Sequence, residues 1–254
     1  MFINLKFFKI SSIVLPIHYN HIVQAFIYNV IDSKLADFLH DEGFGEGRKF
    51  KMFTFSKLQG RFDVKSKPGC IIFDKEVALT VSSPYGTFCQ SFANGVIKNK
   101  ILLGENELEI TEAELVPVEV NEDEIVVETL SPIVVYSTLT KHNGSKYTVY
   151  FTPEEKEFEE QINQNLKHKY EAFVKESDRK KEVTEGWIKI KPLSKTKQHI
   201  INYKDFIIKG YSGVFKLEGP KELLKLGLEA GLGAKNSMGF GCVRRVEGKI
   251  LRNS

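Results

Sequence analysis

The sequence predicts an α+β fold, because segments with strand and helix periodicity follow one another in the order β-α-β-β-α-β and this order occurs twice. A length of 254 residues suits one large domain or two of ordinary size. An acidic region near position 122 separates the two copies. Two tandem ferredoxin-like (RRM-like) domains, residues 1–121 and 122–254, account for this pattern.

The first copy opens with an alternating strand and an amphipathic helix. Residues 3–7 alternate between apolar and polar side chains, and residues 21–31 carry one apolar stripe. Asp32 and Ser33 are good N-caps, so a second short helix is expected to begin there and to end near His40, before a glycine-rich loop. The other elements expected in this copy are strands over 50–58 and 70–81, a helix over 84–98 and an extended segment over 101–118.

The second copy repeats the order of the first. A strand-like segment over 124–138 precedes a long amphipathic helix over 153–174, and residues 177–205 are largely irregular. The elements expected in the rest of this copy are strands over 187–190 and 205–217, a helix over 220–230, a glycine loop over 231–241 and a closing strand over 242–246. The same kind of domain is therefore expected twice.

The composition is that of a folded protein without a membrane span. Hydrophobic residues make up 42% of the chain, and no stretch approaches the roughly 20 apolar residues that a bilayer requires. Lys6 and Lys9 interrupt the apolar residues at the N-terminus, and the run 13–17 is too short for the core of a signal peptide. These features predict a cytoplasmic protein with no membrane partner.

The three cysteines are scattered along the chain and form no CxxC or Cys/His pair of the kind that holds zinc. Buried free thiols are expected for Cys70, Cys89 and Cys242. The sequence therefore predicts neither a metal site nor a cofactor.

Charge is distributed unevenly, although the net charge is only +3. Residues 105–128 contain ten acidic residues and no basic one, whereas residues 179–209 contain nine basic residues and few acidic ones. Such polarity favours a protein with one face that follows phosphates, and the alternative is solvated charge on strands and loops. Further basic residues of the C-terminal part are Lys235, Arg244, Arg245, Lys249 and Arg252.

The most specific local feature is the run GLGAKNSMGFG over 231–241. It is not a P-loop, because no Lys-Ser/Thr pair follows at the required spacing, and Asn236 occupies the position of the third glycine of a dinucleotide fingerprint. Four glycines allow positive φ and close approach of another backbone, and Lys235 adds a cation. A cradle for an RNA backbone and a tight helix-to-strand turn both fit this run.

This run, followed by Cys-Val, resembles the C-terminal glycine-rich signature of the repeat-RNA processing endoribonucleases of CRISPR systems. These enzymes form the sixth CRISPR-associated family within the RAMP superfamily. Further blocks match in the family's order, so the resemblance spans nearly the whole chain. These blocks are YNH at 19–21, IYN at 27–29, LH at 39–40, KMFTFS at 51–56 and LSPI at 130–133.

The resemblance implies two ferredoxin-like domains and metal-independent cleavage of CRISPR repeat RNA on the 3′ side of a short stem. It further implies a 2′,3′-cyclic phosphate end and a mature crRNA as products of the pre-crRNA. A CRISPR interference complex and a homodimer are further partners that the resemblance suggests.

RNA carries its own nucleophile, so cleavage needs a base for the 2′-hydroxyl, an acid for the 5′ oxygen and cations for the phosphorane. Histidine suits the first two roles near neutral pH. Among six histidines, His40 lies at the expected end of a short helix, whose dipole favours imidazolium, and Asp41 and Glu42 act in the same direction. The alternative is an exposed helix-terminal histidine, but the resemblance also implies that His40 is catalytic.

Tyr28 lies opposite the apolar stripe of its helix, on the same side as His21 and Gln24. The resemblance implies that Tyr28 orients the scissile phosphate or the 2′-hydroxyl. One continuous helix would separate Tyr28 from His40 by about 18 Å, which is too far for one phosphate. The break at residues 32–33 must therefore fold the second helix back.

Lys51 opens the expected strand 51–56, and the resemblance implies that its ammonium stabilises transition-state charge. The alternative is a solvated lysine whose place Arg48 or Lys49 could take. His21 is the reserve candidate for the second proton transfer, and His199 lies in the basic stretch and is a candidate RNA contact. The two other histidines outside this region, His142 at a hairpin turn and His168 on a helix surface, are given no role.

The expected RNA contacts combine the glycine loop with basic residues of the second half. They are Gly231, Gly233, Lys235, Gly239, Gly241, Arg244, Arg245, Lys189, Lys191, Lys195, Lys197 and His21.

The alternative function is a non-catalytic RAMP-type subunit that holds the repeat-derived handle of crRNA. A generic RRM-type binder would need exposed aromatic residues in RNP order, which the sequence lacks. A metal-dependent nuclease is disfavoured, because the carboxylates cluster mainly in the acidic linker region.

Overall fold

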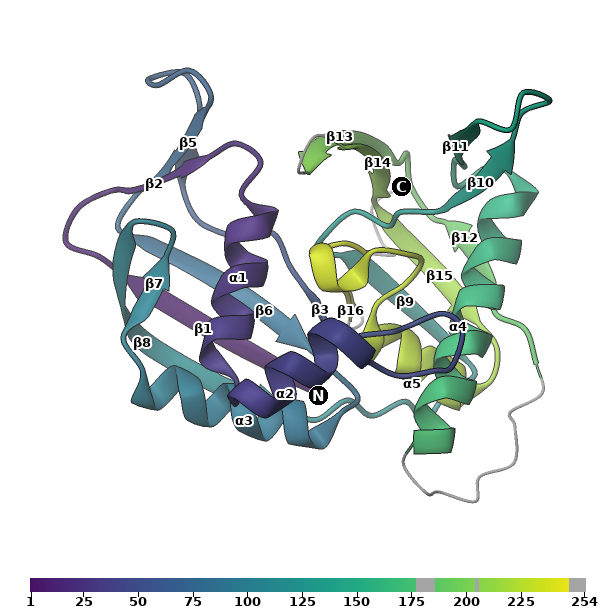
Figure 1. Ribbon diagram of the computed structural model, residues 1–254, viewed down its shortest axis with the longest axis horizontal. Coiled ribbons are helices and arrows are strands. Elements are labelled where there is room, and N and C mark those ends of the chain that lie inside the picture. The colour runs from purple at the N-terminus through teal and green to yellow at the C-terminus, as the bar shows by residue number, and fades with distance from the viewer. Residues whose placement is uncertain (177–185, 204–205, 247–254) are drawn as a thin grey trace.

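The computed structural model describes residues 1–176, 186–203 and 206–246. Two α+β halves lie side by side, and Figure 1 shows α1 and α3 against one face of the first sheet. The first half consists of β1 (Phe2–Phe8), β2 (Ile13–Pro16), α1 (Asn20–Val30), α2 (Ser33–Asp37), a π-helical turn (Phe38–Glu42), β3 (Thr54–Phe55), β4 (Phe62–Asp63), β5 (Cys70–Phe73), β6 (Glu76–Ser82), α3 (Gly86–Lys98), β7 (Ile101–Leu103) and β8 (Asn106–Val116).

The second half repeats this plan with two extra hairpins. It consists of β9 (Glu124–Thr129), β10 (Tyr136–Thr140), β11 (Lys146–Tyr150), α4 (Lys156–Glu176), β12 (Lys189–Pro192), β13 (Lys197–Tyr203), β14 (Phe206–Ser212), β15 (Val214–Glu218), α5 (Lys221–Ala230), a 3₁₀ turn (Asn236–Met238) and β16 (Val243–Arg245).

The two main sheets have the same topology. Their strand orders are β3-β6-β1-β8-β7 and β12-β15-β9-β16, and in both the first strand of the βαββαβ unit pairs antiparallel with the third and the fourth. The predicted class, two tandem ferredoxin-like domains, is confirmed. The chain passes from the first sheet to the second between β8 and β9, and we retain residue 121 as the proposed end of the first domain.

The apolar stripe of α1 explains how the first domain packs. Val23, Phe26, Ile27 and Val30 are buried, as the 3.6-residue period predicts. The four long helices lie within a few residues of their predicted positions. One core cluster runs through both halves, and the Met1 ammonium pairs with the Glu229 carboxylate at 2.5 Å. The domains therefore form a continuous hydrophobic core.

Several predicted strands are wrong in extent. The strand over 50–58 reduces to β3, because Met52 has a φ of 53° that breaks the extended backbone. The segments 70–81, 101–118, 124–138 and 205–217 each divide into two strands joined by turns or loops. The hairpin β13–β14 replaces part of the stretch expected to be irregular, and residues 177–185 lie outside the described residues. The turns and loops that divide these segments are short, and element boundaries are the least reliable part of a prediction from periodicity.

Cys89 and Cys242 are buried free thiols, as predicted, while Cys70 is partly exposed. Burial raises the pKa of Cys89 to about 11 and that of Cys242 to about 12. Within the described residues, no group of three or more His, Cys, Asp or Glu side chains is placed to hold a metal. In the same ranges, no helix has the length and apolar character needed to cross a bilayer.

Candidate active site between the two domains

Tyr28 and His40 meet because the chain folds back after α1. The Asp32 carboxylate caps α2 by accepting hydrogen bonds from the backbone N–H groups of Lys34 at 3.0 Å and Leu35 at 3.3 Å. The rings of Tyr28 and His40 lie edge to face with centroids 6.2 Å apart. The predicted fold-back is confirmed, and the phenol and the imidazole border the same space.

His40 lies in a π-helical turn rather than at the end of an α-helix. The α2 helix ends at Asp37, earlier than predicted, and the N–H of Gly43 donates to the Phe38 carbonyl at 2.7 Å across five residues. Such turns occur frequently at functional sites. The His40 side chain is 77% exposed, and its Nδ1 lies 2.6 Å from the Asp41 carboxylate. Because an ionised carboxylate only accepts, we assign a proton to Nδ1, and this contact leaves Nε2 unused.

Lys51 contacts His40 directly. Its ammonium donates to the His40 carbonyl at 2.5 Å, and burial lowers the pKa of Lys51 even though Asp41 raises it. The neighbouring Arg48 instead packs its guanidinium over the Phe50 ring. Lys51 is therefore anchored at the site, and its place is not equivalent to that of Arg48.

The polar face of α1 points at the second domain. Gln24 donates to the Ser237 carbonyl at 2.8 Å and accepts from the Tyr203 hydroxyl, and Tyr28 packs against Phe53 with centroids 5.8 Å apart. Burial raises the pKa of Tyr28 to about 12, so its phenol is neutral and able to donate at physiological pH. His21, seven residues before Tyr28, lies about 10 Å farther along the helix. The structure therefore does not bring His21 together with His40.

The glycine loop packs tightly on its own protein. A Cβ on Gly241 would lie 1.9 Å from the Leu232 carbonyl oxygen, and one on Gly239 would lie 2.3 Å from the Phe55 ring. Gly231 and Gly233 also have positive φ and are crowded by neighbouring atoms. These contacts support the tight-turn interpretation for the glycines themselves.

A buried lysine that the sequence analysis missed holds this loop. Lys169 of α4 is 3% exposed, and its ammonium donates to the Gly231 carbonyl and to the Asn236 side-chain oxygen, both at 2.7 Å. It also reaches the Gly233 carbonyl at 3.3 Å, and burial lowers its pKa well below the ordinary value. Lys169 follows Leu166 by three residues within the apolar stripe of α4. A lysine within an apolar stripe is the sequence feature that could have identified it as a buried residue.

A basic pocket of about 120 Å³ lies where residues 48–53 meet the glycine loop. Among the described residues that line it, Arg48, Lys49, Lys51, Lys169 and Lys235 are basic and none is acidic. Lys235 has a φ of 61°, which is uncommon for a non-glycine residue, and its ammonium lies 5.1 Å from the centre of the Tyr136 ring. Five basic side chains without a carboxylate favour an anionic ligand.

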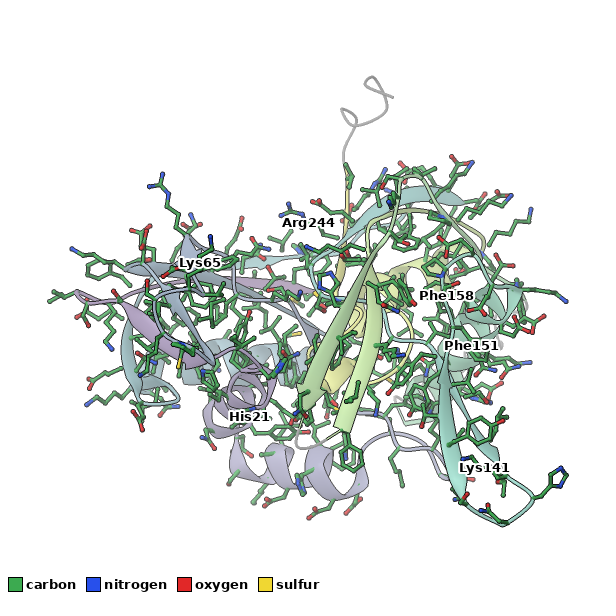
Figure 2. The ribbon with its side chains drawn as sticks, turned by 90° about the horizontal axis from the view of Figure 1, so that it is seen from above. His21, Lys65, Lys141, Phe151, Phe158 and Arg244 are labelled. Carbon is green, nitrogen blue, oxygen red and sulfur yellow. The ribbon has the colours of Figure 1, made fainter. Side chains whose placement is uncertain are left out.

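The other predicted RNA contacts lie elsewhere. Arg244 pairs with Glu128 at 2.5 Å, Arg245 with Glu122 at 2.9 Å and Lys189 with Glu218 at 3.2 Å. These residues and Lys191 belong to β12 and β16, whose buried residues Ile190 and Val243 face the core. Figure 2 shows Arg244 on the opposite side of the molecule from His21. The structure therefore separates Arg244, Arg245, Lys189 and Lys191 from the pocket.

Lys195 and Lys197 are exposed around the start of β13, and Lys249 and Arg252 lie outside the described residues.

His199 forms a network between the domains. The Lys57 ammonium lies 3.1 Å from Nδ1, and Nε2 lies 2.7 Å from the Ser212 hydroxyl. Since an ammonium only donates, Nδ1 accepts and Nε2–H donates to Ser212. Burial, followed by the charges of Lys57 and Lys197, lowers the pKa of His199 to about 4. The imidazole is neutral at physiological pH.

The fold should lose stability on acidification through His199. Its pKa of about 4 in the folded state lies below the ordinary 6.5, so between these values the unfolded chain takes up a proton that the folded chain does not. The free energy of unfolding is expected to fall as the pH decreases through this window. Thermal melts of wild type and His199→Gln from pH 7 to pH 4 test this. The variant should lose less Tm than the wild type, and equal losses would contradict the assignment.

Comparison with solved structures shows which proteins share this fold. The fold matches that of a solved RAMP protein described as binding different RNA substrates, with a TM-score of 0.78, 24% identity and coverage of 97% of this chain and 100% of that one. A solved CRISPR-associated protein Cas6 matches with a TM-score of 0.77 and 30% identity over 97% and 99% of the two chains. The protein thus shares the fold of these solved structures, two tandem ferredoxin-like domains.

Sequence comparisons define the family. Models of the N-terminal and C-terminal parts of the CRISPR-associated protein Cas6 match residues 14–119 and 113–245. CRISPR-associated endoribonuclease Cas6 1 of Methanocaldococcus jannaschii is 34% identical over 241 residues, 94% of this chain and 91% of that protein. CRISPR-associated endoribonuclease Cas6 of Pyrococcus furiosus is 30% identical over 92% and 84% of the two chains. This chain belongs to the Cas6 family.

Proposed function

We propose that this Cas6-family chain is an endoribonuclease that cleaves CRISPR repeat RNA in pre-crRNA to yield mature crRNA. Cleavage needs no metal and leaves a 2′,3′-cyclic phosphate. The observation that carries this proposal is the meeting of the Tyr28 phenol, the His40 imidazole and the Lys51 ammonium beside a basic pocket. The endoribonuclease names of the similar proteins from M. jannaschii and P. furiosus support the same activity.

The chemistry requires a bond exchange at phosphorus. The 2′-oxygen bonds to phosphorus and gives its proton to solvent water, while the bond from phosphorus to the 5′ oxygen breaks and that oxygen gains a proton. We assign the latter proton to His40 Nε2, because the Asp41 carboxylate contacts Nδ1 and orients the ring. The neutral Tyr28 hydroxyl orients the 2′-hydroxyl or a phosphate oxygen.

Lys51 supplies the positive charge that stabilises the phosphorane. We expect Lys51→Met to lower single-turnover cleavage by about 10²-fold, as the loss of one charge-stabilising donor does elsewhere. Binding of repeat RNA should change little, because Arg48, Lys49 and Lys235 remain in the pocket. Lys49→Met is the matched control. A Lys51→Met rate equal to that of the wild type would exclude this role.

In this proposal the RNA backbone binds along the basic pocket. Lys235 contacts the backbone directly, whereas Gly231, Gly233, Gly239 and Gly241 shape the loop that presents it. Lys195, Lys197, His199 and His21 are further candidate contacts near the domain junction. A homodimer and an interference complex remain expectations from the resemblance, and a cytoplasmic location remains an expectation from the composition. Gel filtration of the purified chain with and without repeat RNA tests the homodimer.

Incubation of the purified protein with a repeat-containing transcript and a shuffled control tests the function. We expect the protein to release a product of discrete size from the repeat transcript and none from the shuffled control. If the protein binds repeat RNA without cutting it, the non-catalytic RAMP-type subunit is the correct function.

A further inference from the structure

The hairpin β10–β11 is an addition to the ferredoxin-like plan. It forms a two-stranded sheet of its own between β9 and α4, paired from Tyr136↔Tyr150 to Thr140↔Lys146. We call residues 136–150 the arm. In Figure 1 it projects from the upper part of the second domain, and five residues per strand give it a length of roughly 17 Å. Nothing in the proposed chemistry accounts for it.

The base of the arm is fixed to the candidate active site. The Tyr136 ring lies under the Lys235 ammonium, which belongs to the basic pocket, and stacks at a tilt on Tyr150 with centroids 5.8 Å apart. The Tyr150 hydroxyl donates to the Ile207 carbonyl of β14 at 2.9 Å. Two independent contacts thus set the direction in which the arm leaves the pocket.

The outer part of the arm has the chemistry of an RNA-binding surface. The sequence from 130 to 152 contains no aspartate or glutamate, and the arm carries Lys141 and Lys146 beside its turn. Lys141 lies 5.6 Å from the Tyr147 ring centre, and Tyr147 is 41% exposed. Among the described residues, neither lysine has a carboxylate at ion-pair distance. Free cations beside an exposed aromatic ring suit phosphates and a stacked base.

The turn at the end of the arm is ordered by its own hydrogen bonds. The Asn143 side-chain oxygen accepts from the N–H of Ser145 at 3.1 Å and from its hydroxyl at 2.7 Å, and the N–H of Gly144 donates to the Lys141 carbonyl at 2.9 Å. Gly144 has a φ of 79°, which favours glycine. A preorganised turn presents the two lysines at low entropic cost.

We infer that the 136–150 arm is a second RNA-contact surface, which grips the substrate beyond Lys235 through Lys141, Lys146 and Tyr147. Figure 2 shows Lys141 at the end of the arm, on the same side of the molecule as His21. An RNA strand that leaves the basic pocket past Lys235 meets Tyr136 and then the lysines near the turn. This inference rests on the proposed function, because it names a contact for the same substrate.

The test compares Lys141→Ala/Lys146→Ala and Tyr147→Ala with the wild type. The matched control is Lys98→Ala/Lys100→Ala, two lysines of the first domain, of which Lys100 pairs with Glu107 at 2.7 Å. The Kd for a repeat RNA with a 2′-deoxy nucleotide at the scissile bond is measured at several KCl concentrations. For the double arm variant we expect a Kd raised about tenfold and a salt slope reduced by about 0.7 for each lost phosphate contact. Tyr147→Ala should raise the Kd by about fivefold or more, with an unchanged slope.

Cleavage at saturating RNA should stay within about twofold of wild type for both arm variants, because they leave Tyr28, His40 and Lys51 intact. RNAs shortened from either end should bind wild type and arm variants equally once they no longer reach the arm. If wild type cleaves the repeat but the arm variants bind every RNA with wild-type Kd and slope, the arm inference is wrong. If wild type does not cleave, the proposed function fails instead.

Discussion

His40→Ala should lower the single-turnover rate of repeat-RNA cleavage by about 10²- to 10⁴-fold, the usual contribution of a positioned proton donor. The Kd for repeat RNA should stay within about twofold of the wild-type value, because the imidazole is largely exposed and the basic pocket is unchanged. His168→Ala, at an exposed position of α4, is the matched control and should cleave like the wild type. The measurement is the rate with enzyme in excess over labelled RNA.

A modified leaving group separates an acid from a base at His40. Sulfur in place of the 5′ oxygen leaves without a proton, so such an RNA should be cleaved by His40→Ala at nearly the wild-type rate. If His40→Ala cleaves the sulfur-containing RNA as slowly as it cleaves ordinary RNA, His40 acts as the base instead. A His40→Ala enzyme that cleaves ordinary RNA at the wild-type rate would remove His40 from the chemistry altogether.

Lys169→Met should lower both stability and cleavage. Methionine fills the buried space but leaves the Gly231 carbonyl and the Asn236 side-chain oxygen without their ammonium donor. An unsatisfied buried acceptor costs about 1–3 kcal/mol, so we expect a loss of about 2–4 kcal/mol in the free energy of unfolding. At about 2–4 °C for each kcal/mol in a chain of this size, Tm should fall by roughly 5–15 °C.

A second effect of Lys169→Met acts in the opposite direction, because methionine removes the cost of burying a charged group. Well-packed apolar replacements of buried ions are neutral or stabilising when no polar group is left unpaired. Here the loop carbonyls stay in place after the substitution, so the loss of their donor should dominate. Lys167→Met, at an exposed position of the same helix, is the control and should leave Tm unchanged. A Tm for Lys169→Met at or above the wild-type value would show that the ammonium does not hold the loop.

The meeting of Tyr28 and His40 could be predicted because the resemblance implies that both act at one phosphate, and local rules then require a break between them. A helix advances about 1.5 Å per residue, and Asp32 is a capping residue, so the helix had to break if the two side chains were to share a phosphate. The role of Lys169 could not be predicted in the same way. Its partners are the carbonyls of a loop more than sixty residues away, and sequence periodicity does not show such long-range contacts.

The basic residues of the second sheet show why an RNA-binding face is difficult to predict from sequence. A cluster of lysines and arginines in the sequence predicts an RNA face only if their neighbours are known. Arg244 lies opposite Glu128 in the strand register, and Lys189 lies opposite Glu218. The acidic residues that neutralise them come from β9 and β15, so strand pairing decides the charge of the face. The glycine spacing also fitted two interpretations, and the crowding around Gly239 and Gly241 supports the tight turn.

The most direct test of the proposed active site is cleavage, in excess EDTA, of two repeat RNAs that differ only by a 2′-deoxy nucleotide on the 5′ side of the cut bond. A phenol, an imidazole and an ammonium that act on RNA's own 2′-oxygen require no metal. The all-ribose RNA should be cut at its full rate to a 2′,3′-cyclic phosphate, and the deoxy RNA should stay intact. Cleavage of the deoxy RNA, or loss of all cleavage in EDTA, would contradict this account.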